Sequence, residues 1–273
     1  MGWTVTDDVD EFWRATHDHL RAHRVASTVV LSAVDRLRAR GSPDGIPELA
    51  WWTDGAGVGA TVIRTPPHRP VVSAMPDDAA RAWAAHRPPP AWVMGPPQTV
   101  DRLASAWGAT VEVAVRERLH RLAALVPPPD PTPTRPAADA ERECLSSWWS
   151  AFHREATPDS PPPPREAVDA AVDDGRVLVA VDGDTPVAWA VVGHPVLGVS
   201  RIGPVYTLPA HRGRGHGAAV TAAVARLAGA RGADEVLLFT DLANPTSNAL
   251  YARLGFVGVQ DVIDARLRSS TRG

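Results

Sequence analysis

Residues 211–217 read HRGRGHG, in which three glycines alternate with arginine and histidine. Glycine reaches positive φ values and lets a ligand approach the main chain closely, and arginine side chains bind phosphate oxygens. Three interpretations are open for this stretch: a phosphate-binding loop, an Arg/Gly segment for nucleic acid, or a loop that is merely flexible. The flanking sequence has to decide between them.

The composition argues against two of the anion-binding classes. The 273 residues carry a formal net charge of −3, whereas nucleic-acid-binding domains are usually basic. All 28 basic residues are arginine, so the chain lacks the lysine of a Walker A phosphate loop. The spacing GxGxG also differs from the GxGxxG of dinucleotide-binding folds.

The predicted elements place this loop between a strand and a helix. The apolar stretch 200–210 predicts a strand, and residues 218–232 predict a helix with Val220, Val224 and Leu227 on one face. A glycine-rich turn at a helix start presents unpaired N–H groups and the positive end of the helix dipole. Such a turn is an anion site suited to a pyrophosphate.

Helices and strands are also predicted in turn along the rest of the C-terminal half. Two helices are predicted at 138–156 and 165–175, and a hairpin with an Asp-Gly turn at 176–193. A short buried strand follows at 235–240 and a helix at 244–256. The prolines at 161–164 predict a loop between the first two helices.

The N-terminal half also reads as mixed α/β. Helix is predicted over residues 8–40 with a break near Val25. DGAGVGA, residues 54–60, lies between two predicted strands, so a hairpin turn is preferred to a phosphate loop. The further predicted strands are 48–53, 58–65, 69–74 and 110–122, and the further helices are 77–86 and 99–108.

A proline-rich stretch divides the chain almost in half. Six prolines between residues 126 and 137 favour an extended connector over a helix or a sheet interior. The length allows one large domain or two ordinary ones. We therefore expect domains at 1–125 and 138–273, joined by the linker 126–137.

Two motifs carry a resemblance to a known family. Residues 212–217 fit R-x-x-G-x-G, and NPTSNALYARLGF follows at 244–256. With the strand that ends in Val205-Tyr206-Thr207, this combination resembles the GNAT superfamily of N-acetyltransferases, most strongly over 200–256. It is similar in particular to GNAT proteins with a degenerate N-terminal half. The implied fold is a mixed α/β sheet, GNAT-like in the C-terminal half and degenerate GNAT-like in the N-terminal half.

The resemblance implies acetyl-CoA as co-substrate and assigns residues to it. Pantetheine would pair with Val205–Thr207 as an added strand, and the pyrophosphate would bind the N–H groups of Gly213–Ala218. Asn244 and Ser247 have helix capping as a second interpretation, and both roles can hold. The expected cofactor contacts are Val205, Tyr206, Thr207, Arg212, Gly213, Arg214, Gly215, His216, Gly217, Ala218, Asn244, Ser247 and Asn248.

The resemblance also implies direct attack of an amine on the thioester. Tyr251 is the expected general acid for the leaving thiolate, because a phenol with a pKa of about 10 matches it closely. A backbone N–H near Tyr206 would stabilise the developing oxyanion. Glu155 is the expected general base, with His153, Asp241, His194 or ordered water as alternatives.

Three further groups have a structural and a functional interpretation. Trp148, Trp149 and Phe152 either line an acceptor pocket or pack in the core. His19 and His23 have the spacing of a helical metal-binding pair, but a solvated helix face is preferred and no metal is expected. The single cysteine, Cys144, is expected to be buried packing.

The predicted function is acetyl transfer to a primary amine of a small molecule, such as an amino acid, a polyamine or an amine-bearing antibiotic. Acetylation of protein lysines or N-termini, and a non-catalytic acyl-CoA sensor, are the alternatives. We expect no nucleic-acid partner and a monomer or homodimer. No apolar run reaches the ~18 residues of a membrane span and the start lacks a signal-peptide pattern, so a cytoplasmic protein is expected.

Overall fold

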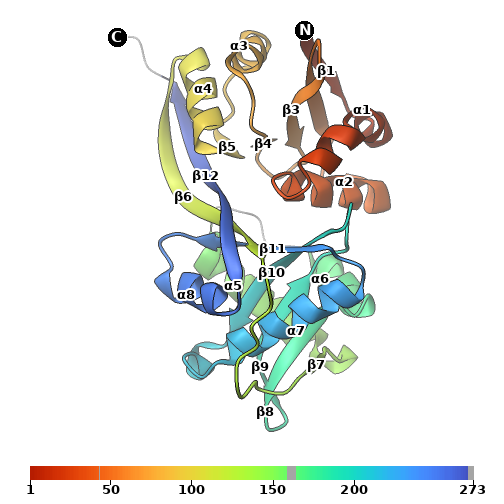
Figure 1. Ribbon diagram of the computed structural model, residues 1–273, viewed down its shortest axis with the longest axis vertical. Helices are drawn as coiled ribbons and strands as arrows, with labels where there is room; N and C mark the ends of the chain where they lie inside the picture. Colours follow the sequence, from red (N-terminus) through yellow and green to blue (C-terminus); the bar gives the residue numbers. More distant parts are fainter. Residues whose placement is uncertain (43, 159–163, 270–273) are drawn as a thin grey trace. The chain divides into compact units, whose positions relative to one another are not determined.

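The computed structural model describes residues 1–42, 44–158 and 164–269 (Figure 1). They form two compact units. Unit 1 comprises Met1–Leu119, Thr240–Ala243 and Val259–Gly273, and unit 2 comprises His120–Phe239 and Asn244–Gly258. The loop expected at 161–164 lies outside the described residues except for its last position.

The two halves of the chain repeat one order of elements. The first half runs β1 (Gly2–Thr6), α1 (Val9–Ala22), α2 (Thr28–Arg40), β2 (Glu48–Asp54), β3 (Gly57–Arg64), β4 (Val71–Val72), α3 (Asp77–His86), β5 (Trp92–Gly95), α4 (Pro97–Trp107) and β6 (Ala109–Leu122). The second runs β7 (Thr134–Pro136), α5 (Arg142–Ala156), α6 (Arg165–Asp173), β8 (Val177–Asp182), β9 (Thr185–Val192), β10 (Val199–Thr207), α7 (His216–Ala230), β11 (Glu235–Asp241), α8 (Pro245–Arg253) and β12 (Phe256–Ser269). Single 3₁₀ turns, η1 (Asp139–Glu141) and η2 (Pro209–His211), precede α5 and follow β10.

Strand pairing repeats in the same way. In unit 1, β1–β2, β2–β3 and β3–β4 are antiparallel pairs and β4–β5 is parallel. In unit 2, β7–β8, β8–β9 and β9–β10 are antiparallel and β10–β11 is parallel. Each unit therefore contains a mixed sheet of the same topology, which confirms the predicted α/β class and the duplicated architecture.

The long strands β6 and β12 each contribute residues to both units. Within unit 1, β12 pairs with β5 in the register Ile263 to Gly95, and Arg118 of β6 forms an ion pair of 2.6 Å with Asp261. Within unit 2, the Ala123 N–H donates to the Gly255 carbonyl at 3.0 Å. The domain bounds expected on either side of residues 126–137 stay a prediction.

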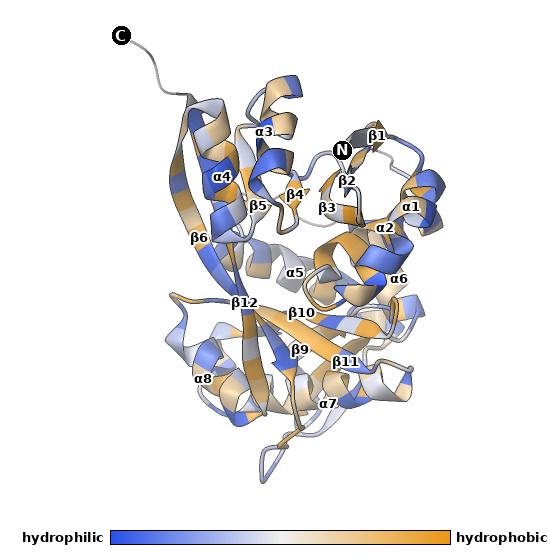
Figure 2. Cartoon of the chain, turned by 45° about the horizontal axis from the view of Figure 1, so that its top comes forward, coloured by the Kyte–Doolittle hydropathy of each residue, from blue (hydrophilic) through white to orange (hydrophobic). Residues whose placement is uncertain are grey.

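The core of unit 2 has two faces because side chains alternate along its strands. Ala188 and Ala190 of β9 pack on the side of α7, together with Val220 and Val224. Trp189, between them, packs on the opposite side with residues of α5 and α6. Hydrophobic colouring runs along much of β10 and β11 in Figure 2, as expected for strands covered on both faces.

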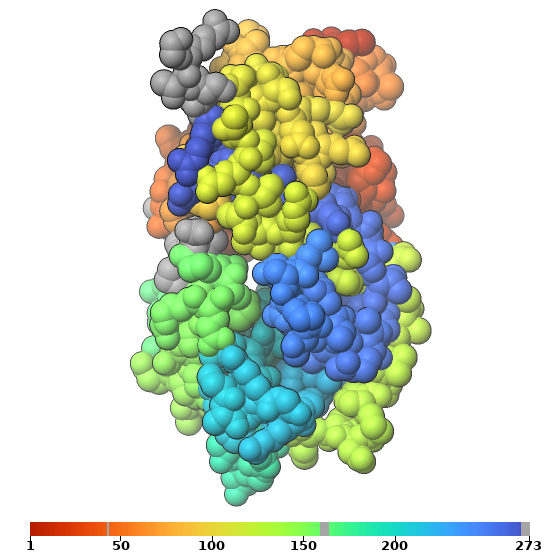
Figure 3. Space-filling view, turned by 90° about the vertical axis from the view of Figure 1, so that its left-hand side faces the viewer, coloured from red at the N-terminus to blue at the C-terminus, as the bar shows by residue number. Residues whose placement is uncertain are grey.

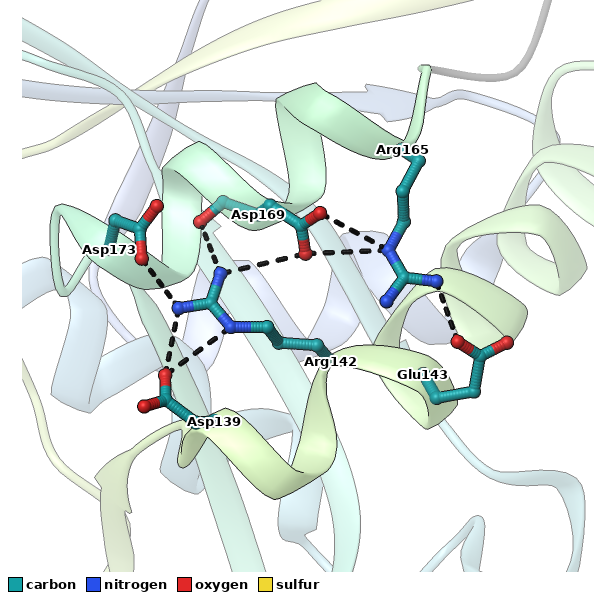
Figure 4. Close-up of polar contacts among 6 residues, drawn as sticks. All are labelled: Asp139, Arg142, Glu143, Arg165, Asp169 and Asp173. Atoms are coloured by element: carbon teal, nitrogen blue, oxygen red, sulfur yellow. Dashed lines mark hydrogen bonds and ion pairs between the residues drawn. The ribbon is translucent and has the colours of Figure 1, made fainter.

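An ionic network fixes α5 to α6 (Figure 4). Arg142, at the first turn of α5, donates to Asp139 at 2.8 Å, to Asp173 at 2.5 Å and to the carbonyl of Asp169 at 2.9 Å. Arg165 of α6 pairs with Glu143 of α5 at 2.6 Å. These contacts hold in place the helix that carries Glu155.

Most predicted elements are present, including the break between α1 and α2 and the hairpin turn after Asp54. Part of the proline-rich stretch forms the strand β7, which pairs with β8. Proline is tolerated there because β7 is an edge strand. The strands β1, β5 and β12 were not predicted. Among the described residues no helix is both long and apolar enough to cross a membrane.

Candidate functional site

The glycine loop lies between η2 and the first residue of α7. Gly213 and Gly215 have φ values of +79° and +86°, in the left-handed region that favours glycine. A Cβ built on either residue would meet no atom of the described residues within 4 Å, its two chain neighbours aside. Backbone conformation rather than crowding therefore selects glycine here, and the space above the loop is open.

The start of α7 supplies unpaired donors to this space. The first intrahelical bond runs from the Ala219 N–H to the Gly215 carbonyl at 3.1 Å, so the preceding N–H groups have no acceptor inside the helix. At Gly217 a Cβ would lie 3.3 Å from the Thr207 Oγ1, so this glycine allows α7 to approach β10 closely. The loop has the features of an anion site.

Strand β10 offers a main-chain edge beside the loop. It pairs with β11 from Val199 to Ile202, and the described register with β11 goes no further. A bulge follows in its pairing with β9, after which Val205–Thr207 pair with Ala188–Ala190 on the β9 side alone. No strand among the described residues is paired with the other edge of Val205–Thr207, so this edge is available to an added strand.

Tyr206 points away from the α7 side of the sheet. Its ring is buried in the cluster formed with α5 and α6, whereas Val205 packs on the α7 side. The Tyr206 hydroxyl donates to Glu155 Oε1 at 2.8 Å. On the α7 side this residue therefore offers its main chain, not its phenol.

Glu155 is held by two donors. Besides Tyr206, Arg212 Nη2 donates to Glu155 Oε2 at 2.6 Å, and Arg212 Nε donates to the Thr207 carbonyl at 3.1 Å. Partial burial opposes ionisation of Glu155, but the hydrogen bonds from Tyr206 and Arg212 outweigh it, so the pKa of this carboxyl is lowered. Its role as general base stays a prediction, and the geometry suits it better to fixing Arg212.

Tyr251 lies on α8 and is 8% exposed. Its ring is 5.9 Å from that of Phe256. Burial raises the pKa of the phenol, so the hydroxyl keeps its proton through neutral pH. That is the protonation state required of a general acid. Its neighbour Leu250 approaches Gly217, which ties α8 to the first turn of α7.

Asn244 caps α8, as one of its two interpretations predicted. Its Oδ1 accepts from the Ser247 N–H at 3.0 Å, and Asn248 Nδ2 donates to the Asn244 carbonyl at 2.8 Å. The capping role is confirmed. Contact of these three residues with a cofactor stays a prediction.

The alternative bases have other partners. His153 Nδ1 lies 2.8 Å from Thr157 Oγ1, and burial lowers the pKa of this histidine. His194 contacts Asp174 at 3.2 Å. It follows the last residues of β9, which pair with β10 at Ile202 and not at Thr207. Asp241 belongs to unit 1 and accepts from the Ala243 N–H at 2.8 Å.

The aromatic residues of α5 contribute to the core of unit 2. The rings of Trp149 and Trp189 are tilted against each other with their centroids 5.1 Å apart, and Phe152 contacts Tyr206 edge-on at 6.4 Å. Trp148, Trp149 and Phe152 are half-buried. In Figure 3, α5 (green), α8 (blue) and the chain around residue 210 (cyan) surround a recess on one face of unit 2. Core packing is confirmed, and an additional role in an acceptor pocket stays a prediction.

The structure also brings together three residues whose association was not predicted. Asp182 at the end of β8, His211 in η2 and His216 at the start of α7 place ligand atoms within 4.8 Å of one another. The available signal was the pair of histidines flanking the loop; Asp182 comes from a hairpin distant in sequence. The rings of His19 on α1 and of His23, the residue that caps its C-terminus, are tilted with their centroids 4.8 Å apart, but no third possible ligand joins them among the described residues.

The DGAGVGA stretch of unit 1 and Cys144 of α5 have the structural roles that the sequence predicted for them. DGAGVGA forms the β2–β3 turn, with Asp54 paired to Gly57. Cys144 is half-buried, its Sγ donates to the Glu141 carbonyl at 2.9 Å, and burial raises the pKa of the thiol. Neither feature takes part in the candidate site.

Comparisons with known proteins agree with this geometry. Residues 142–256 match the profile of the acetyltransferase (GNAT) family. The mycothiol acetyltransferase of Salinispora tropica is 46% identical over 72 residues, which make up 25% of this chain and 23% of that protein, so the match spans about a quarter of the relative. A GNAT-family acetyltransferase from Colwellia psychrerythraea has a TM-score of 0.62 at 8% identity, over 98% of this chain and 100% of that chain. A tandem GNAT protein from the clavulanic acid biosynthesis pathway has a TM-score of 0.57 at 13% identity and covers 100% of both chains. These structures show that the fold is shared over the whole length.

Proposed function

Because residues 142–256 form an acetyltransferase domain of the GNAT family, we propose that the chain transfers acetyl from acetyl-CoA to a primary amine of a small molecule. The observation that carries the proposal is the free edge of Val205–Thr207 beside the open glycine loop. An amino acid, a polyamine or an amine-bearing antibiotic is the proposed acceptor. The partial match to proteins named mycothiol acetyltransferase supports a small-molecule acceptor.

The strand edge and the glycine loop of unit 2 support acetyl-CoA as the co-substrate. Val205–Thr207 would pair with the pantetheine amides, and the N–H groups of Gly213–Ala218 would bind the pyrophosphate. Arg214, whose side chain is 60% exposed, would add a charge at the rim, whereas Arg212 is already bound to Glu155 and Thr207. We also propose that the protein is cytoplasmic, that it is a monomer or a homodimer, and that it has no nucleic-acid partner.

Acetyl-CoA supplies an acetyl group activated as a thioester. An amine nitrogen attacks the carbonyl carbon, and a backbone N–H near Tyr206 donates to the oxygen as negative charge develops there. When the C–S bond breaks, its electron pair goes to sulfur, and the Tyr251 hydroxyl gives that sulfur a proton. The amine loses its own proton to water or to Glu155.

A screen for thiol release tests this proposal. The protein is incubated with acetyl-CoA and a library of small amines, with peptides bearing lysine or free N-termini alongside, and products are identified by mass spectrometry. We expect acetylated small amines. Turnover with peptides alone would establish the protein acetyltransferase alternative. Tight acetyl-CoA binding without turnover on any amine would establish a sensor.

Gly215→Val tests the placement of the pyrophosphate. The loop glycine has a left-handed backbone that valine does not adopt without strain, so the N–H groups should lose their alignment. Loss of one or two charge-assisted hydrogen bonds predicts a roughly tenfold to hundredfold higher Kd for acetyl-CoA, measured by calorimetry. Gly108→Val is the matched control, because Gly108 ends α4 with φ +62° and open surroundings but lies in unit 1. Equal affinities of the two variants would refute the placement.

A further inference from the structure

The side chains of Asp182, His211 and His216 in unit 2 have no role in the reaction proposed above, which uses only the main-chain N–H of His216 among these residues. The members of this cluster come from three features of the fold: the end of β8, the turn η2 and the first residue of α7. Each offers one ligand atom, and the three atoms lie within 4.8 Å of one another.

Two buried ring nitrogens of this cluster have no hydrogen-bond partner among the residues that the structure describes. They are His211 Nδ1 and His216 Nε2. His216 is only 6% exposed, so water does not readily satisfy it. A buried polar atom without a partner costs free energy, roughly 1–3 kcal/mol, and is uncommon in folded proteins. Two such nitrogens facing the same small cluster call for a common partner.

The second nitrogen of His216 is oriented by Thr132. His216 Nδ1 lies 2.8 Å from Thr132 Oγ1, within hydrogen-bond distance. If Nδ1 carries the proton and donates it to Thr132, the lone pair is on Nε2. This is the arrangement of metal-binding histidines, whose other ring nitrogen donates to an oxygen that fixes the tautomer and the ring orientation.

Asp182 supplies the negative charge. One of its oxygens lies 4.0 Å from His211 Nδ1 and 4.0 Å from Arg214 Nη1. Ligands of a tetrahedral ion at about 2.0–2.1 Å are roughly 3.4 Å apart, so the three atoms, now within 4.8 Å of one another, would have to approach by at most about 1.4 Å to close the site. Asp182 is exposed at a hairpin end and Arg214 is exposed on the loop, so both side chains have room to move.

We propose that Asp182, His211 and His216 bind a divalent transition-metal ion of the Zn²⁺ class. Two neutral imidazoles and one carboxylate are ligands that this class prefers, and they leave a fourth position open. The ion would satisfy both orphaned ring nitrogens at once.

Zinc titration of the full chain, in the absence of acetyl-CoA, tests this proposal independently of the proposed function. The protein is first stripped with a chelator and then titrated with Co²⁺, followed by visible absorption, and Zn²⁺ is used to displace it. We expect one equivalent with a tetrahedral Co²⁺ spectrum that Zn²⁺ abolishes. Asp182→Asn, a change at an exposed position, should weaken Zn²⁺ binding at least tenfold. Thr132→Val should weaken it by roughly 10–100-fold through loss of the orienting contact.

His19→Ala/His23→Ala is the matched control, because it removes the other close histidine pair and leaves the cluster intact. This double variant should bind zinc like the wild type. His211→Ala should lose the site while keeping the far-UV circular dichroism of the parent. The proposal is overturned if the stripped chain shows no saturable binding, if Asp182→Asn and His211→Ala both bind normally, or if only the α1 variant loses the ion.

Discussion

At the scale of single residues, the side chain of Tyr251 is buried and carries a hydroxyl group that can donate a proton. Burial raises the pKa of its phenol, so the proton stays in place at every pH below the ordinary tyrosine value of about 10. Tyr251→Phe removes this proton and keeps the ring that packs near Phe256. We expect kcat and kcat/KM to fall together by roughly 10²–10⁴-fold, measured with the true acceptor.

The Kd for acetyl-CoA is the control for this variant. It should stay close to the wild-type value, because the proposed binding groups are the loop and the β10 main chain. The wild-type rate should show no loss from deprotonation of Tyr251 until strongly alkaline pH. A variant that turns over at the wild-type rate, when chemistry is rate-limiting, would remove Tyr251 from the mechanism.

Glu155 differs because both of its oxygens are engaged and its pKa is lowered. Glu155→Gln removes the charge that holds Arg212 but keeps the size of the side chain. As a positioning residue, it should raise the KM for acetyl-CoA and change kcat little. As a general base, it would instead lower kcat by roughly 10²–10⁴-fold and abolish the fall of rate at acid pH, where the carboxylate takes up its proton. Steady-state kinetics across pH separate the two roles.

The residues of the loop could be predicted because glycine spacing and the flanking strand and helix are local signals. The positive φ of Gly213 and Gly215 matches the reason given for glycine there. The ion pair of Glu155 with Arg212 and the approach of Asp182 to His211 could not be predicted. Each depends on the order of β8 and β10 in the sheet and on how α5 packs against it, and the spacing of residues along the chain does not contain this information.

At the scale of elements, Arg142 joins α5 to α6. Hydrogen bonds to Asp139 and Asp173 raise the pKa of its guanidinium and bind it to both helices (Figure 4). Arg142→Ala leaves these carboxylates close together without a cation. We expect a Tm lower by about 2–4 °C and a higher KM for the acceptor, since α5 carries the half-buried aromatic side chains.

Arg226→Ala is the control for this loss of charge. Arg226 lies on the exposed face of α7, and no ion pair to it is formed among the described residues. Calorimetric unfolding should therefore distinguish the two variants. Equal Tm values would show that the network around Arg142 contributes nothing measurable, as is common for exposed ion pairs.

Helices and strands whose periodic apolar pattern extends over many residues could be predicted. Short strands, and strands whose partner lies far away in the sequence, could not. The range 77–86 coincides with α3, whose small apolar residues recur on one face. Strand β5 has only four residues after a run of prolines, too few to show a period of two. Its partner β12 pairs with it from residues 263–266, across most of the chain, so neither segment indicates the other.

At the scale of the whole molecule, the repeat of elements raises the question of a second cofactor site in unit 1. The counterpart of the loop before α7 is the junction of β4 and α3. Residues 73–76 there read SAMP, without glycine, and the N-cap of α3 is Pro76, which has no N–H to donate. Met75 is 3% exposed in the core of unit 1, so this junction is filled by its own side chain.

The edge that pantetheine would need is also closed in unit 1. A Cβ built on Gly95 of β5 would lie 2.8 Å from the Val72 carbonyl of β4, so these two strands touch where β10 and β11 separate. We therefore expect calorimetry on the full chain to give one acetyl-CoA per chain. Gly215→Val should weaken that single site, with no second site of unchanged affinity left behind. A stoichiometry of two, or a residual wild-type site in this variant, would show that unit 1 binds the cofactor through other residues than the matching positions.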